Sequence, residues 1–62
     1  MKRIEEIEKI AKRLMELETT IRITTDEETK YTSMKEVMGI AQDLDLDDML
    51  AIDEYIMNQI DN

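Results

Sequence analysis

The sequence predicts a mostly α-helical fold, in which one segment leaves a small α+β arrangement open. Apolar residues recur at three- and four-residue spacing over most of the chain, Pro is absent and Gly occurs once. The 62 residues allow one domain at most, so 1–62 is read as a single small domain. The expected order is a long N-terminal helix, a short β-hairpin or extended loop at about 19–32, and then two antiparallel helices.

The first helix is predicted over residues 3–18. Its apolar positions fall on one helical face and are Ile4, Ile7, Ile10, Ala11, Leu14 and Leu17. Glu5 and Lys9 stand four residues apart with the acid first, an orientation that stabilises an isolated helix by about 0.2–0.5 kcal/mol. Periodicity and charge pairing therefore agree on a helix here.

Residues 19–32 break that period. Thr20 to Thr24 alternate polar and apolar side chains and are rich in β-branched residues, which favours a strand. Residues 29–32 are the expected antiparallel partner, with 25–28 as the loop, although this loop lacks the Gly or Asn that a tight hairpin turn prefers. The alternative is that the first helix continues to about Ile23 and a loop follows.

Two further helices are predicted from their start signals. Ser33 and Glu36 have the spacing of a capping box, which places the start of the second helix at Ser33. Asp45 suits the N-cap of a third helix over residues 46–60, since Asp47 and Asp48 then lie in the first turn near the positive end of the helix dipole. Residues 43–45 would form the corner between these helices.

The same corner has the spacing of a calcium-binding loop. Asp43, Asp45, Asp47 and Glu54 occupy the first, third, fifth and twelfth positions of an EF-hand pattern. Asp48 stands at the sixth position, where the loop needs a Gly for its sharp turn. The sequence therefore favours a helix–helix corner, with a degenerate calcium loop as an alternative.

The net charge of −8 belongs entirely to one part of the chain. Residues 1–35 carry eight basic and eight acidic side chains, whereas residues 36–62 carry eight acidic side chains and no Lys or Arg. Direct binding of nucleic acid is not expected, because the predicted third helix has no cation to approach phosphates. A basic protein surface, of the kind that binds nucleic acid, is the partner that this acidic segment predicts.

Catalysis is not expected. The chain has no His or Cys, and its one Ser, Ser33, is explained as a cap, so no activated nucleophile is evident. The sequence indicates no cofactor and no metal site. It also lacks an apolar run that could span a bilayer and the apolar region of a signal peptide, which predicts a cytoplasmic protein.

We therefore expect a small acidic, non-enzymatic binding protein that blocks its partner by nucleic-acid mimicry. The residues predicted to contact the partner are Asp43, Asp47, Asp48, Asp53, Glu54, Tyr55 and Asp61. In size, acidity and lack of catalytic groups the chain resembles phage- and plasmid-borne inhibitors such as anti-CRISPR proteins, and an antitoxin would share these traits. The alternative is a helical oligomerisation module whose acidity only maintains solubility, and a homodimer stays open in either case.

Overall fold

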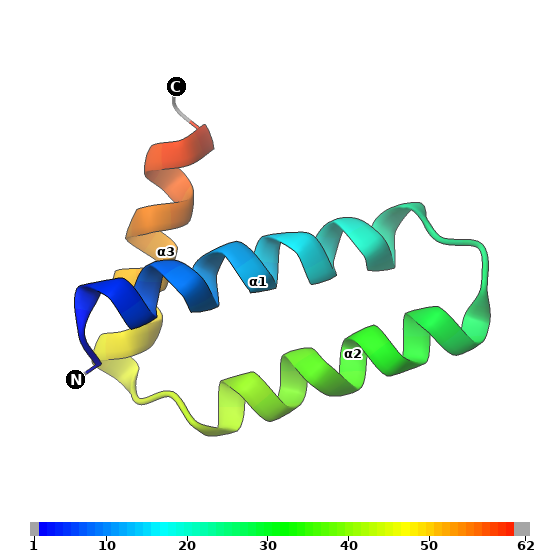
Figure 1. Cartoon of the computed structure of the whole chain (residues 1–62), viewed down its shortest axis with the longest axis horizontal. Helices are drawn as coiled ribbons and strands as arrows, with labels where there is room; N and C mark the ends of the chain where they lie inside the picture. The colour runs from blue at the N-terminus through cyan, green and yellow to red at the C-terminus, as the bar shows by residue number, and fades with distance from the viewer. Residues whose placement is uncertain (1, 61–62) are drawn as a thin grey trace.

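Residues 2–60 are described by a computed structural model, and within that range the chain forms helices and no strand. The helices are α1 (Ile4–Ile23), α2 (Glu27–Gln42) and α3 (Leu46–Ile60) (Figure 1). The prediction of a mostly helical fold is confirmed. None of these helices combines the length and the apolar character that crossing a bilayer requires.

The predicted hairpin is wrong, because its first strand is the last part of α1. The hydroxyls of Thr19 and Thr20 donate to the carbonyls of Met15 and Glu16 at 2.9 and 3.0 Å, so these β-branched residues are accommodated within the helix. Ile21 lies two turns beyond Leu14 and is half-buried, which extends the apolar face past residue 18. The alternative, in which the first helix runs to Ile23, is confirmed.

The second half of the predicted hairpin is the start of α2. Asp26 is the N-cap, and its carboxylate accepts hydrogen bonds from the backbone N–H of Thr29 at 3.3 Å and from the Thr29 hydroxyl at 2.5 Å. The predicted cap at Ser33 is therefore wrong. Ser33 lies in the middle of α2 and is buried, as a small residue at a helix contact often is.

The predicted antiparallel pair of C-terminal helices is also wrong. α2 runs back alongside α1, whereas α3 crosses the beginning of α1 steeply and points away (Figure 1). Within residues 2–60, α1 packs against both other helices, and α2 and α3 do not pack against each other.

The core lies mainly between α1 and α3. Ile7 and Ala11 of α1 and Ile52 of α3 form the buried cluster. Partly buried residues packed around it are Ile10, Leu14, Leu44, Ala51, Tyr55 and Ile56. Leu17 is buried as well, one turn and a half further along α1 from Ala11. So small a core follows from the chain length and leaves much apolar surface outside it.

An ion pair joins α1 to α2 at the surface. The Arg13 guanidinium donates to both carboxylate oxygens of Glu36, at 2.6 and 2.9 Å. This bidentate contact lowers the pKa of Glu36. One of the eight carboxylates in the acidic segment is thus already paired within the molecule.

Candidate functional site

Most of the predicted contact residues lie on one part of the molecule, which we call the acidic arm and define as residues 43–60. It comprises the corner after α2 and the whole of α3, and it contains no Lys or Arg. Asp43 is the C-cap of α2, Asp45 lies in the corner and Asp47 in the first turn of α3, and all three are exposed. Asp61 lies outside the described residues.

Asp48 is the exception, since its carboxylate faces inward. It is only 3% exposed and accepts a hydrogen bond of 2.8 Å from the backbone N–H of Lys2. The backbone N–H of Asp48 in turn donates to the Asp45 carboxylate at 2.8 Å, so Asp45 is the N-cap of α3, as predicted. Asp48 therefore holds the chain before α1 against the start of α3, and it offers no surface charge to a partner.

These hydrogen bonds predict how stability depends on pH. The backbone N–H groups of Lys2 and then Asp45 favour the ionised form and lower the pKa of Asp48. A carboxylate with a lowered folded pKa stabilises the fold above its unfolded pKa, about 3.9, and loses that contribution as the pH falls through the folded pKa. We expect Asp48→Asn to lower the melting temperature at pH 7, as measured by circular dichroism. In this variant the melting temperature should also decrease less than in the wild type as the pH is lowered into the acidic range.

Asp47→Asn is the matched control, because Asp47 lies in the same helical turn and is exposed. It should leave the pH profile close to that of the wild type. The melting temperature of Asp48→Asn should still decrease somewhat at acidic pH. The reason is that a hydrogen bond from Thr29 lowers the pKa of Asp26, and one from Arg13 lowers the pKa of Glu36. Identical pH profiles for Asp48→Asn and the wild type would show that the buried carboxylate is not a stabilising group.

The remaining carboxylates of α3 do not share one face. Asp47 and Glu54 are seven residues apart, which places them on the same side of the helix about 10 Å from each other. Asp53 is rotated by about 100° from Glu54 and borders an apolar groove. The structure therefore places Asp47 and Glu54 on one side of α3, which begins directly after the corner residues Asp43 and Asp45, and it separates Asp53 from that side.

Tyr55 packs against the core cluster and is only half-exposed. It lines a shallow hollow between α1 and α3, together with Ile4, Glu8 and Glu54. The ring is thus partly used in holding α3 on α1. The other part of the ring is exposed in the hollow that Glu54 also lines.

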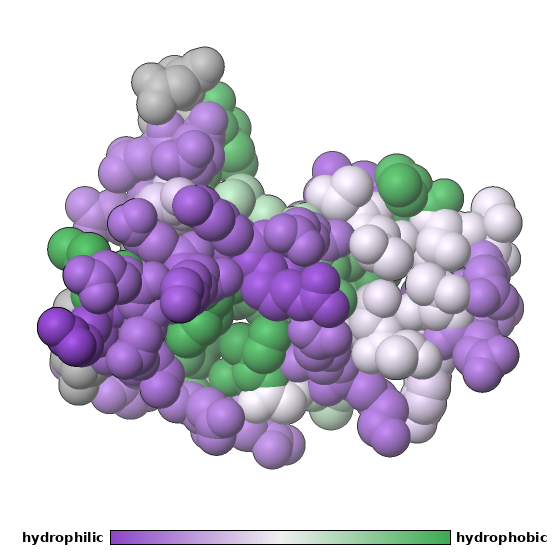
Figure 2. Space-filling model, in the orientation of Figure 1, coloured by the Kyte–Doolittle hydropathy of each residue, from purple (hydrophilic) through white to green (hydrophobic). Residues whose placement is uncertain are grey.

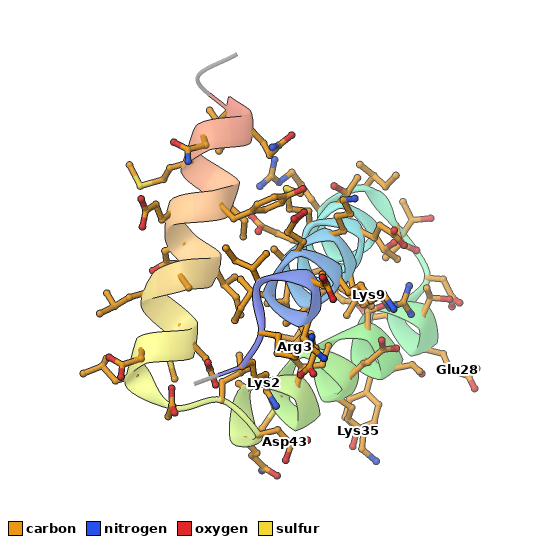
Figure 3. The ribbon with its side chains drawn as sticks, turned by 60° about the vertical axis from the view of Figure 1, so that its left-hand side comes forward. Lys2, Arg3, Lys9, Glu28, Lys35 and Asp43 are labelled. Carbon is orange, nitrogen blue, oxygen red and sulfur yellow. The ribbon has the colours of Figure 1, made fainter. Side chains whose placement is uncertain are left out.

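Two basic residues from the start of the chain lie close to the acidic arm in the folded structure. Lys2 and Arg3 lie at the same end of the molecule as Asp43 (Figure 3). The hydrogen bond from Lys2 to Asp48 fixes that neighbourhood. In the sequence, every Lys and Arg precedes the acidic arm. In the folded structure, Lys2 and Arg3 lie close to the start of the arm (Figure 3), so basic and acidic residues are only partly separated.

The calcium-loop alternative does not fit the backbone. Residues 46–54 belong to α3, so only 43–45 of the twelve loop positions lie outside a helix. Glu54, at the twelfth position, stands two turns along α3 from Asp47. No group of three or more carboxylates within residues 2–60 is arranged to hold a metal ion.

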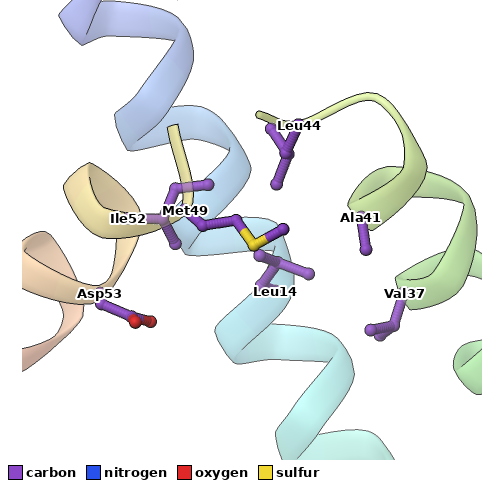
Figure 4. Close-up of a pocket in the computed structure, with 7 residues that line it drawn as sticks. All are labelled: Leu14, Val37, Ala41, Leu44, Met49, Ile52 and Asp53. Atoms are coloured by element: carbon purple, nitrogen blue, oxygen red, sulfur yellow. The ribbon is translucent and has the colours of Figure 1, made fainter. Parts of the chain in front are cut away.

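An apolar groove, which the sequence analysis did not identify, opens between α2 and α3 over α1 (Figure 4). One part has a volume of about 210 Å³ and is lined by Leu14, Val37, Ala41, Leu44, Met49, Ile52 and Asp53. A second part of about 300 Å³ shares four of these residues and continues along α1 to Glu18 and Ile21 and along α3 to Ile56. We refer to both parts together as the groove.

The groove exists because α2 runs alongside α1 while α3 crosses it steeply (Figure 1), so within the described part of the chain α2 and α3 do not pack against each other. In Figure 2 apolar residues are visible in the hollow between α1 and α2 and along one edge of α3. The sequence did show that α3 has more apolar residues than one packed helix face needs. Leu46, Met49, Leu50 and Met57 all lie outside the core. The sequence does not show how α3 crosses α1, so this excess of apolar residues could not be read as a groove.

Comparison of the chain with protein-family models, with curated proteins and with solved structures finds no match.

Proposed function

We propose that this chain is a small, non-enzymatic binding protein that docks its acidic arm on a basic, nucleic-acid-binding protein and blocks it. The observation that carries the proposal is the run of exposed carboxylates over the corner and one side of α3: Asp43, Asp45, Asp47 and Glu54. No Lys or Arg occurs in residues 43–60 to neutralise them from within the arm. Such a surface attracts a basic partner and accelerates encounter with it.

The corner is the part of the arm that best resembles a nucleic-acid strand. Asp43, Asp45 and Asp47 fall within five residues, whereas Asp47 and Glu54 are about 10 Å apart along α3. Phosphates follow each other about every 3.4 Å along one strand. We therefore place the centre of the contact at the corner and expect Glu54 to extend it.

The test compares two double variants that carry the same charge. Asp47→Lys with Glu54→Lys reverses the arm, and Glu27→Lys with Glu28→Lys reverses the first turn of α2 at the opposite end of the molecule (Figure 1). Two reversals of +2 each change the net charge from −8 to −4 in both. Glu27 and Glu28 both lie in a first helical turn, whereas only Asp47 of the arm pair does, so the control loses at least as much favourable interaction with the helix dipole as the arm variant.

Each protein is immobilised and exposed to a cell lysate, and the proteins retained are identified by mass spectrometry. A basic protein that is retained is then purified and tested for displacement of a labelled single-stranded oligonucleotide. We expect the wild type and the α2 variant to displace it, the arm variant to be at least tenfold weaker, and added salt to weaken the effect. Equal displacement by both variants, or binding that salt does not change, would contradict the proposal.

The second candidate is an oligomerisation module, and the groove is the observation that favours it. The part lined by Met49 and Val37 is almost wholly apolar, so an occupant would be held by burial of apolar surface. Such an assembly would be much less sensitive to salt than docking by the arm.

A further inference from the structure

Three apolar surfaces of this chain lack a partner within residues 2–60. One is the groove. A second is a row of α3 side chains, Leu46, Leu50, Met57 and Ile60, which are 71%, 59%, 63% and 74% exposed. The third is a stripe on α2 formed by Tyr31, Met34 and Met38, which are 64%, 49% and 62% exposed. Their three- and four-residue spacing places them on one side of the helix, and we call them the α2 stripe.

The single chain buries little apolar surface for its size. Among the described residues the buried apolar side chains are Ile7, Ala11, Leu17 and Ile52. Small domains that build so limited a core are usually reinforced by disulfides, by a metal or by oligomerisation. This sequence contains no Cys and no His, which leaves association with another chain as the route that its residues favour.

The charges around the groove and the middle of the α2 stripe are complementary. Asp53 borders the groove, and its carboxylate has no ion-pair partner within residues 2–60. Glu18 also lines the groove and is paired with Arg22 at 2.9 Å. Lys30 and Lys35 flank the α2 stripe on either side of Met34, and the ammonium of Lys35 lies 5.6 Å from the centre of the Tyr31 ring. The stripe also has one acidic neighbour, Glu27, which lies one turn before Tyr31 at the far end of α2 from the groove residues Val37 and Ala41.

The other helices are poorer occupants of the groove. α3 carries Asp47, Asp53 and Glu54 and no cation, so a second α3 would bring carboxylates against Asp53. The apolar face of α1 is partly buried within the chain, at Ile7, Ala11 and Leu17, and its Leu14 and Ile21 already line the groove itself. The outer side of α2 is therefore the element of this chain that supplies both an apolar stripe and positive charge.

The α2 stripe and the groove also adjoin each other on the molecule. Val37 and Ala41 line the groove, and Met34 and Met38 follow them around α2 toward its outer side. A symmetric dimer needs such an arrangement, since the same patch must meet its copy across a twofold axis. A standard interface of about 800 Å² per partner would take roughly a sixth of the 5051 Å² that the chain exposes.

We propose that two copies of this chain form a symmetric dimer in which the α2 stripe of each copy lies in the groove of the other. Met34 and Met38 contact the apolar lining around Val37, Met49 and Ile56. Lys30 and Lys35 lie near Asp53 of the second copy. The carboxylates of Asp43, Asp45, Asp47 and Glu54 are not part of this interface, although Leu44 of the corner lines the groove. The proposal deepens the second candidate, oligomerisation through the groove, and it stands or falls separately from docking by the acidic arm.

The first test measures the mass of the chain in solution by sedimentation and light scattering. We expect a dimer of the wild type, and a melting temperature that rises with protein concentration. The double variant Met34→Glu with Met38→Glu should raise the dissociation constant of the dimer at least a hundredfold. The control is Leu50→Glu with Met57→Glu, which adds the same charge at α3 positions that are 59% and 63% exposed and outside the groove lining, and it should stay dimeric.

The second test is a charge exchange that does not depend on the methionine variants being folded. Asp53→Lys should weaken the dimer at least tenfold, because it places a cation near Lys30 and Lys35. Adding Lys30→Glu and Lys35→Glu to the same chain should restore dimerisation. A folded wild-type monomer at high micromolar concentration, a dimer unaffected by the Met34 and Met38 changes, or failure of the restored pair would each overturn the proposal.

Discussion

Ile52→Ala is expected to abolish most of the folding stability of this protein. Ile52 is 3% exposed and is the residue through which α3 enters the buried cluster with Ile7 and Ala11. Truncating a buried Ile to Ala costs about 2–5 kcal/mol, since both apolar burial and packing are lost. The single core of a domain of this size rarely supplies more than about 3–5 kcal/mol of stability. We expect urea unfolding, followed by circular dichroism at one protein concentration, to begin near zero urea.

Ile23→Ala provides the matched control for this change. The same atoms are removed, but Ile23 is 72% exposed at the end of α1, so its loss should change stability by less than about 0.5 kcal/mol. The comparison separates the effect of burial from that of the residue type. Equal unfolding midpoints for Ile52→Ala and Ile23→Ala would show that α3 is not held by this cluster.

Ala11→Leu is expected to destabilise the fold by about 1–3 kcal/mol, because the added atoms have no space between α1 and α3. Ala11 has no exposed surface, and it contributes the smallest side chain to the buried cluster. A larger residue there must push α3 away from α1. Since Leu favours helix about as well as other long side chains do, any loss of stability reports packing and not helix propensity.

Combining Ala11→Leu with Ile52→Ala tests the contact directly. The larger residue at 11 should fill part of the space left at 52, so the double variant should be less destabilised than the sum of the single ones. Residues in contact typically show a coupling of about 0.5–3 kcal/mol in such a cycle. Additive losses would mean that the two side chains do not share the same space.

The sequence was most informative where a signal is local. The apolar spacing of Ile7, Ala11 and Leu14 predicted the first helix, and Asp45 with Asp47 predicted where α3 begins. It was misleading between residues 19 and 33, where Thr-rich composition favours a strand when it is read without its neighbours. There the hydroxyls of Thr19 and Thr20 bond within the helix, and Ile21 continues the apolar face of α1.

The candidate site was predictable in composition but not in arrangement. Asp43, Asp47 and Glu54 are exposed as expected, because carboxylates without a buried partner remain in water. Asp48 looked equivalent to Asp47 in the sequence, since both fit the first turn of a helix. Only the approach of Lys2, which lies 46 residues away in the chain, makes Asp48 an internal hydrogen-bond acceptor.

The helices outside residues 19–33, the acidic composition of the last third and the lack of Cys and His were determined by the sequence alone, because each depends on residue identity or on neighbours within a few positions. The crossing of α3 over α1, the groove beside it and the burial of Asp48 were decided only by the tertiary structure. These three features depend on which apolar helix faces pack against each other. Helical periodicity shows that a face is apolar, but it does not show which element covers that face.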